Sequence, residues 1–339
     1  MAEQFTVPTV DISAYVDGGT DAARAATARA LDEACRTVGF VQITGHGVPS
    51  SVVDGLTGAA DEFFALPPQV KGAYRSPANR GYSPPKSESL SLSLGVESAS
   101  RMNDFFEAFN VGVEEQDANL WPAEAAGFRP GVEAWFAEAG RVARVLTTVF
   151  ADALGLPRGF FDAYTDRSLD VLRLNNYALP PGEVELDGDL TGMGEHTDYG
   201  IVTVLWADQV RGLQVLDADG DWHDVEPADG ALLVNLGDLM ARWTNERWMS
   251  TLHRVKPPIV DGTIERRRSA AFFHDGNVDA VIAAIPTCVE PGAEPTYPPI
   301  TVGEHIAAKL AGSRAGTANP AAEREAARVL AAGSSSSST

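Results

Sequence analysis

The chain has 339 residues, of which 44% are hydrophobic and 22% are charged, so it can bury a substantial core. Asp and Glu number 47 against 26 Lys and Arg, and the resulting net charge of −21 disfavours nucleic-acid backbones and anionic membranes as partners. Two cysteines cannot build a disulfide framework, and neither an apolar run of 18 residues nor a secretory leader is recognisable, so we expect a cytoplasmic protein.

Helical patterns dominate the first half of the chain. The stretch 20–38 is predicted to form a helix. It begins with Thr20, a suitable N-cap, and places apolar side chains on one face. Further elements are a strand at 40–43, a helix at 50–66 and a helix at 130–155 with apolar residues at three- and four-residue spacing. The stretch from 76 to 100 is rich in Ser, Pro and Gly and predicts a long loop.

The pattern changes near Ser168, after which short apolar strands alternate with acidic, Gly-rich turns. Strands are predicted at 171–178, 201–206, 212–216, 222–225, 231–235, 250–255 and 269–274. The sequence Asp-Ala-Asp-Gly-Asp at 217–221 suits a hairpin turn between two of them. Short strands in such a series predict a small sandwich or jelly roll.

Two histidines and one aspartate in this part of the chain form a candidate metal site. His196 and Asp198 are two residues apart, so in extended backbone both side chains point the same way. His253 follows in a second predicted strand. Two imidazoles and one carboxylate on one face of an ion match the facial arrangement of non-haem Fe(II) oxygenases. Such a triad leaves three adjacent positions of a six-coordinate ion open for a chelating 2-oxo acid and dioxygen.

Polar residues also alternate along two predicted strands. In the first strand Arg173, Asn175 and Tyr177 share one face, opposite a face of leucines. In the last strand Arg267 and Ser269 share a face. This alternation suits a polar pocket inside a β-barrel. A buried Arg173 needs an anionic or acceptor partner, which is either a substrate or a nearby Asp or Glu.

With these motifs the chain resembles the Fe(II)/2-oxoglutarate-dependent dioxygenases of the isopenicillin N synthase-like family. The resemblance covers residues 7–282 and includes Val7-Pro-Thr-Val-Asp-Ile-Ser13 and Gly39-Phe-Val-Gln-Ile-Thr-Gly-His-Gly-Val-Pro49. The His-x-Asp pair, the distal His and the Arg-x-Ser pair occur in the family's order. The resemblance implies an α+β fold, with a double-stranded β-helix (jelly roll) core flanked by N-terminal and C-terminal helices.

The resemblance also implies a division of the chain. An N-terminal non-haem dioxygenase region at 1–166 is expected to complete the barrel, and 167–282 is expected to form the jelly-roll core. A C-terminal helical segment is expected at 283–332, where the Ala-, Glu- and Arg-rich composition of residues 318–332 predicts a loose helix. The Ser-rich end, 333–339, is expected to be disordered.

By resemblance, Fe(II) is bound by His196, Asp198 and His253, and 2-oxoglutarate is held by Arg267, Ser269, Tyr177 and Asn175. No catalytic residue is implied beyond the metal centre. The expected reaction uses O2 to hydroxylate, desaturate or cyclise a small-molecule metabolite while 2-oxoglutarate is converted to succinate and CO2. The expected substrate contacts are Arg173, Phe105 and Phe273. A bacterial member of this branch is expected to act in secondary metabolism, such as antibiotic biosynthesis, without an obligate protein partner.

Two other functions fit the same residues. One is an isopenicillin N synthase-like oxidase that uses O2 without 2-oxoglutarate, in which the Arg-x-Ser pair holds a substrate carboxylate. The other is a non-catalytic jelly-roll metal-binding or sensor protein, which has no need of a cosubstrate clamp.

The chain departs from the family pattern at Asn176, Arg268 and His274-Asp275, and none of these is a predicted ligand.

Overall fold

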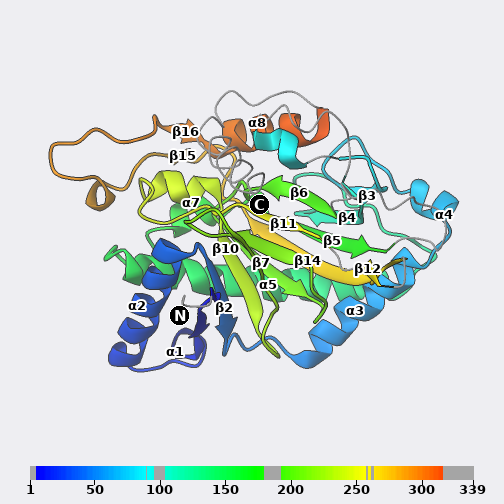
Figure 1. Ribbon diagram of the computed structural model, residues 1–339, viewed down its shortest axis with the longest axis horizontal. Helices are drawn as coiled ribbons and strands as arrows, with labels where there is room; N and C mark the ends of the chain where they lie inside the picture. Colours follow the sequence, from blue (N-terminus) through cyan, green and yellow to red (C-terminus); the bar gives the residue numbers. More distant parts are fainter. Residues whose placement is uncertain are drawn as a thin grey trace.

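Residues of two β-sheets line one cavity. Helices cover the outer face of the larger sheet (Figure 1). The computed structural model describes residues 5–88, 90–94, 104–178, 192–256, 259–260 and 263–315. Two facing sheets with flanking helices are the arrangement of a jelly roll in an α+β fold. The predicted fold class is therefore confirmed.

The larger sheet has eight strands. Their order is β1 (Thr9–Asp11), β2 (Phe40–Thr44), β10 (Leu232–Leu236), β7 (Val202–Ala207), β14 (Arg267–His274), β5 (Val171–Tyr177), β4 (Glu107–Gly112) and β3 (Gly81–Ser83). β1 and β2 are parallel, and the other neighbours pair antiparallel.

The smaller sheet has four antiparallel strands. Their order is β6 (Met193–His196), β11 (His253–Val255), β8 (Leu213–Leu216) and β9 (Trp222–Asp224). Two short antiparallel pairs lie outside both sheets: β12 (Ile259–Val260) with β13 (Thr263–Ile264), and β15 (Val281–Ile282) with β16 (Ile300–Thr301).

The helices fall before, between and after these strands. Their bounds are α1 (Ser13–Val16), α2 (Asp21–Thr37), α3 (Ser50–Phe64), α4 (Pro68–Gly72), α5 (Phe128–Ala153), α6 (Asp162–Thr165), α7 (Asp238–Trp243) and α8 (Val302–Ala315). Short 3-10 helices occur at Leu90–Leu94 and Pro286–Cys288. No helix in these described stretches combines the length and the apolar character that crossing a bilayer requires.

The long helix α5 packs against the larger sheet. Its side chains Trp135, Val142 and Phe150 are fully buried, as the three- and four-residue spacing predicts. Phe136 of α5 meets Phe272 of β14 edge-on, with ring centroids 5.1 Å apart. Helices α2 and α3 lie against α5 and extend this layer (Figure 1). The helical layer closes the outer face of the sheet, and the inner face is left to form the cavity.

Strands β5 and β14 lie side by side in the centre of the larger sheet. Leu172 and Leu174 of β5 point into the apolar core beneath the helices. The alternate side chains, those of Arg173, Asn175 and Tyr177, line the cavity. The register places Arg267 opposite Tyr177 and Ser269 opposite Asn175. The strand period thus collects the polar side chains of both strands on one face.

Several predicted elements are confirmed. The helices predicted at 20–38, 50–66 and 130–155 are α2, α3 and α5. Thr20 caps α2 by accepting a hydrogen bond from the Ala23 amide. The turn at 217–221 joins β8 to β9, and the Asp217 amide donates to the Asp221 carbonyl.

Other elements differ from prediction. The single long loop predicted at 76–100 is wrong, because this stretch contains β3 and a 3-10 helix at Leu90–Leu94. Strand β4 was not predicted because it is buried on both faces and so shows no apolar–polar alternation. The predictions for 318–332 and 333–339 lie outside the described residues.

Candidate metal centre and cosubstrate pocket

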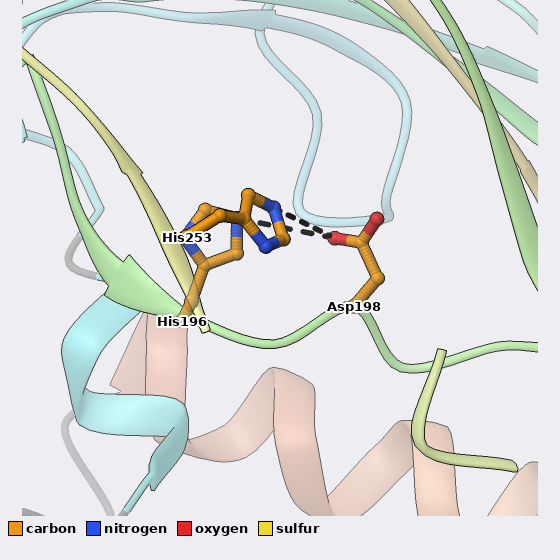
Figure 2. Close-up of side chains that lie close together, drawn as sticks. All are labelled: His196, Asp198 and His253. Carbon is orange, nitrogen blue, oxygen red and sulfur yellow. Dashed lines mark ion pairs between the residues drawn. The ribbon is translucent and has the colours of Figure 1, made fainter. Parts of the chain in front are cut away.

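The two histidines and the aspartate of the candidate metal site meet at the cavity. His196 ends β6 and pairs directly with His253, the first residue of β11, while Asp198 lies two residues after β6. Asp198 Oδ1 lies 3.9 Å from His196 Nε2 and 3.7 Å from His253 Nε2. Figure 2 shows both imidazoles turned toward this carboxylate. The three ligand atoms lie within 4.8 Å of one another, which is close enough for one cation.

Hydrogen bonds leave one ligand atom of each side chain available. His196 Nδ1 lies 2.8 Å from the Gly194 carbonyl and His253 Nδ1 lies 3.1 Å from the Thr251 carbonyl. A carbonyl only accepts, so each Nδ1 carries the hydrogen and each Nε2 presents its lone pair. For Asp198, two donors hold Oδ2: Asn235 Nδ2 at 2.6 Å and the Thr203 hydroxyl. Oδ1 is left to face the histidines.

Burial also favours the metal-binding form of His196. Desolvation lowers the pKa of His196, and the neighbouring His253 lowers it further. A neutral imidazole is the form that binds a cation, so a buried His196 need not lose a proton to do so at neutral pH.

Helix α8 contacts the loop that carries Thr197 and Asp198, which we call the metal-binding loop. Asp238, the first residue of α7, donates its backbone amide to the Asp198 carbonyl at 2.8 Å. Its carboxylate contacts Lys309 Nζ of α8 at 2.6 Å, and both side chains are buried. Burial alone would raise the pKa of Asp238, but Lys309 and His305 outweigh it and the pKa is lowered. Lys309 Nζ also donates to the Thr197 hydroxyl, between the two ligands of the loop.

A buried arginine lies in the same cavity as the triad. Arg267 is 2% exposed, and its guanidinium lies over the Tyr177 ring with 5.4 Å between Cζ and the ring centroid. Asn175 Nδ2 donates to Ser269 Oγ at 3.3 Å. We call these four residues the inner pocket. Within the described structure Arg267 Nε and Nη1 have no hydrogen-bond acceptor.

The inner pocket fits a carboxylate. Burial lowers the pKa of Arg267, yet guanidinium stays charged in proteins, so its Nε and Nη1 groups, unpaired among the described residues, need an anion. A carboxylate offers two oxygens in the geometry that the guanidinium fork matches. Burial raises the pKa of Tyr177 to about 12, so its hydroxyl stays protonated and can donate.

Two of the three predicted substrate residues line the cavity in the described structure. Arg173 lines the cavity and donates Nη2 to Glu88 at 2.8 Å, so the partner is an acidic residue of the chain. Phe273 also lines the cavity. Phe105 is buried beneath the ammonium of Lys86 and is absent from the described lining, so its substrate role stays a prediction.

Several lining residues had no sequence signal. Glu88 and Asn110 come from the region before the predicted strands, and Ile306, Leu310 and Ser313 come from α8. Glu88 lies in the stretch predicted as a loop, where no periodicity assigns a side chain to a face. The cavity holds about 1030 Å³ of space between atoms, a volume that includes open solvent at its mouth.

Comparison with known proteins decides the family. A family model described as the 2OG-Fe(II) oxygenase superfamily matches residues 169–276, and one for the N-terminal part of the non-haem dioxygenases in morphine synthesis matches 7–124. The 2-oxoglutarate-Fe(II) type oxidoreductase hxnY of Emericella nidulans is 36% identical over 313 residues, which cover 88% of each chain. The chain belongs to the 2OG-Fe(II) oxygenase superfamily. The resemblance read from the sequence is confirmed.

Further relatives of this oxygenase support the same family assignment. The validamycin A dioxygenase of Streptomyces hygroscopicus subsp. limoneus is 31% identical over 90% of this chain and 86% of its own. A Neurospora crassa protein solved in complex with alpha-KG and thymine has a TM-score of 0.82 at 28% identity, covering 92% of this chain and 98% of that one. This oxygenase is thus an Fe(II)- and 2-oxoglutarate-dependent oxidoreductase that uses O2 and acts on a small molecule.

Proposed function

We propose that Fe(II) binds to His196, Asp198 and His253 and that the inner pocket holds 2-oxoglutarate through Arg267. The observation that carries this proposal is a buried arginine with two unpaired N–H groups, among the described residues, in the same cavity as a histidine–aspartate–histidine cluster. When bound, Fe(II), 2-oxoglutarate and O2 supply the oxidation, in which the 2-oxo acid is converted to succinate and CO2 and the substrate is oxidised.

The residues of the chain bind and orient rather than transfer protons. The two Nε2 atoms and Asp198 Oδ1 would hold Fe(II), and the net positive charge of the triad with this ion would favour an anionic chelator. Arg267 would pair with the distal carboxylate of 2-oxoglutarate, and the Ser269 and Tyr177 hydroxyls would donate to the same carboxylate. Asn175 Nδ2 donates to the Ser269 hydroxyl and holds it in place. The apolar walls of the cavity keep these interactions out of water, which strengthens them.

The substrate is proposed to lie outside the inner pocket, against Arg173 and Phe273. Thymine in the Neurospora complex and validamycin A in the name of the Streptomyces relative are small polar molecules, and both belong to proteins similar to this one. We extend this class to the present oxygenase and propose a metabolite of secondary metabolism, free in the cytoplasm, as its substrate. We retain the division at residues 166 and 282 as a proposal.

An anaerobic titration tests the metal and cosubstrate assignments together. Adding Fe(II) and then 2-oxoglutarate is expected to produce the charge-transfer absorption of the chelate. Admitting O2 with a panel of metabolites is then expected to yield succinate. Product without succinate would favour the oxidase, and chelation without turnover of any metabolite would favour the metal-binding or sensor protein.

A further inference from the structure

Strand β14 and the residue after it line the cavity along its length. Arg267, Ser269, Ala271, Phe273 and Asp275 all face it, at every second position, as strand alternation requires. Arg267 and Ser269 belong to the inner pocket. Asp275 lies at the opposite end of this row and has no part in binding Fe(II) or 2-oxoglutarate.

Asp275 carries a buried carboxyl group for which the described residues offer no partner. The residue is 8% exposed, and in the part of the chain that the structure describes its carboxyl makes no hydrogen bond or ion pair. Its Oδ1 packs against the backbone of Gly200, where a Cβ would overlap it. Burial raises the pKa of Asp275 well above its ordinary value, so this carboxyl group needs a cationic partner to stay ionised. Buried carboxyl groups that serve the fold are hydrogen-bonded, so this one is available to a ligand.

Arg173, which lines the cavity outside the inner pocket, already has an acidic partner. Arg173 donates to Glu88 Oε2 at 2.8 Å and through Nε to Asn175 at 3.1 Å. Its guanidinium also lies over the Phe106 ring, with Cζ 5.0 Å from the centroid. A substrate carboxylate would have to compete with Glu88 for this guanidinium in a desolvated site. Arg173 therefore gives the cavity no net preference for an acid.

One more polar atom on this side of the cavity has no partner among the described residues. Asn110 donates Nδ2 to Asn79 at 2.6 Å, and its Oδ1 is buried without a donor among the described residues. The Tyr199 side chain also lines this side of the cavity, and its hydroxyl is buried. An amide oxygen only accepts, as does an ionised carboxylate, whereas a hydroxyl does both. We call Asn110, Arg173, Tyr199, Phe273 and Asp275 the outer pocket.

We propose that the outer pocket selects a small substrate that presents N–H donors, and that a protonated amine of this substrate binds Asp275. The inference rests on the proposed function, because the inner pocket has to hold the cosubstrate for the substrate to lie beyond it. An ammonium group and Asp275 neutralise each other, and charge-assisted hydrogen bonds are roughly twice as strong as neutral ones. Asn110 Oδ1 accepts from a second N–H. A carboxylic acid is disfavoured, because it would place a second carboxyl group against Asp275.

Three matched probes test this selectivity. Benzylamine, benzyl alcohol and benzoate share a ring and differ in the polar group. Each is titrated by calorimetry into anaerobic protein loaded with Fe(II) and 2-oxoglutarate. We expect benzylamine to bind about ten- to hundredfold more tightly than benzoate, with benzyl alcohol between them. In Asp275→Asn the preference for the amine over the alcohol should disappear.

Asp279→Asn is the matched control. Asp279 lies four residues further along and its side chain is 65% exposed, so the variant loses the same charge outside the cavity and should keep the wild-type preference. Asp275→Asn should unfold at the wild-type temperature or higher, because it loses no partner. Tighter binding of benzoate, no binding of benzylamine, an unchanged preference in Asp275→Asn, or a lower unfolding temperature of that variant would overturn the proposal. The chelate absorption, recorded before any probe is added, tests the proposed function separately.

Discussion

At the scale of single residues, the site depends on which polar atoms make no hydrogen bond within the described part of the chain. Backbone carbonyls occupy the Nδ1 atoms of His196 and His253, and Asn235 and Thr203 occupy one oxygen of Asp198. The two Nε2 atoms and the other oxygen of Asp198 remain, and the three ligand atoms of the site lie within 4.8 Å of one another. Arg267 follows the same rule, since two of its N–H groups are buried and unpaired in the described structure.

Asp198→Ala tests the metal site. Two neutral imidazoles without the anion bind Fe(II) weakly, so we expect bound iron and turnover to be lost. The fold should persist with a loss of about 1–3 kcal/mol, because the Asn235 and Thr203 donors lose their acceptor. Metal analysis after gel filtration and chemical unfolding measure the two effects. Iron content equal to wild type would show that the metal lies elsewhere.

Arg267→Ala tests the cosubstrate clamp. Truncating one partner of a buried charge pair costs about 2–5 kcal/mol, which is roughly a 30- to 5000-fold loss of 2-oxoglutarate affinity. Iron binding should be unchanged, because no metal ligand is altered. Arg268→Ala is the control, since Arg268 points to the opposite face and pairs with Asp208 and Asp61. Wild-type 2-oxoglutarate affinity in Arg267→Ala, followed by the chelate absorption, would remove Arg267 from the clamp.

Residue roles were predictable where the backbone is regular. Alternation along β5 and β14 is visible in the sequence, and it places the polar residues of the inner pocket on one face. The sequence did not decide whether the partner of Arg173 is a substrate or an acidic residue of the chain. Glu88 lies 85 positions away, in a stretch without periodicity, so only the folded chain identifies the pair.

At the scale of elements, α8 connects the C-terminal part of the chain to the metal-binding loop. Ile306, Leu310 and Ser313 line the cavity, while Lys309 reaches Asp238 behind the loop. A helix in this part of the chain was expected, but its buried lysine was not. Lysine is rarely buried without a partner, and the partner lies 71 residues earlier in the sequence. Strand β4 was missed for a related reason, because complete burial removes the alternation that marks a strand.

Lys309→Met tests this attachment. It leaves the Asp238 carboxylate buried and unpaired, which costs about 3–5 kcal/mol in the free energy of unfolding. Hydrogen exchange in α8 should become faster, since its buried ion pair is lost. The double variant Lys309→Met with Asp238→Asn should recover part of the stability, because no buried charge remains. Equal stability of Lys309→Met and wild type in a denaturant titration would contradict the attachment.

At the scale of the whole molecule, the regions before and after residue 167 share one sheet. Strands β1 to β4 precede that residue and pair within the same eight-stranded sheet as β5, β7, β10 and β14. The jelly-roll class was predictable from the series of short strands. The contribution of the earlier strands depended on the family resemblance, because long-range pairing leaves no local pattern in the sequence.

The stability of the molecule is expected to depend on pH through His305. Burial lowers the pKa of His305 from 6.5 to about 4. Between these values the unfolded chain takes up a proton that the native state does not, so the free energy of unfolding falls as the pH drops from 6.5 to 4. The contribution is roughly 3 kcal/mol over that window and constant above it. His305→Gln should flatten this part of the profile, and an unaltered slope would assign the pH dependence to other groups.

The stoichiometry of turnover tests the central claim most directly. Oxygen uptake, 2-oxoglutarate consumption, succinate and oxidised product are measured in one reaction, with a metabolite that stimulates oxygen uptake. An Fe(II)/2-oxoglutarate-dependent oxygenase consumes O2 and 2-oxoglutarate and forms succinate and product in equal amounts, and we predict this result for the wild-type protein. Formation of oxidised product and uptake of O2 without 2-oxoglutarate consumption or succinate would contradict the account.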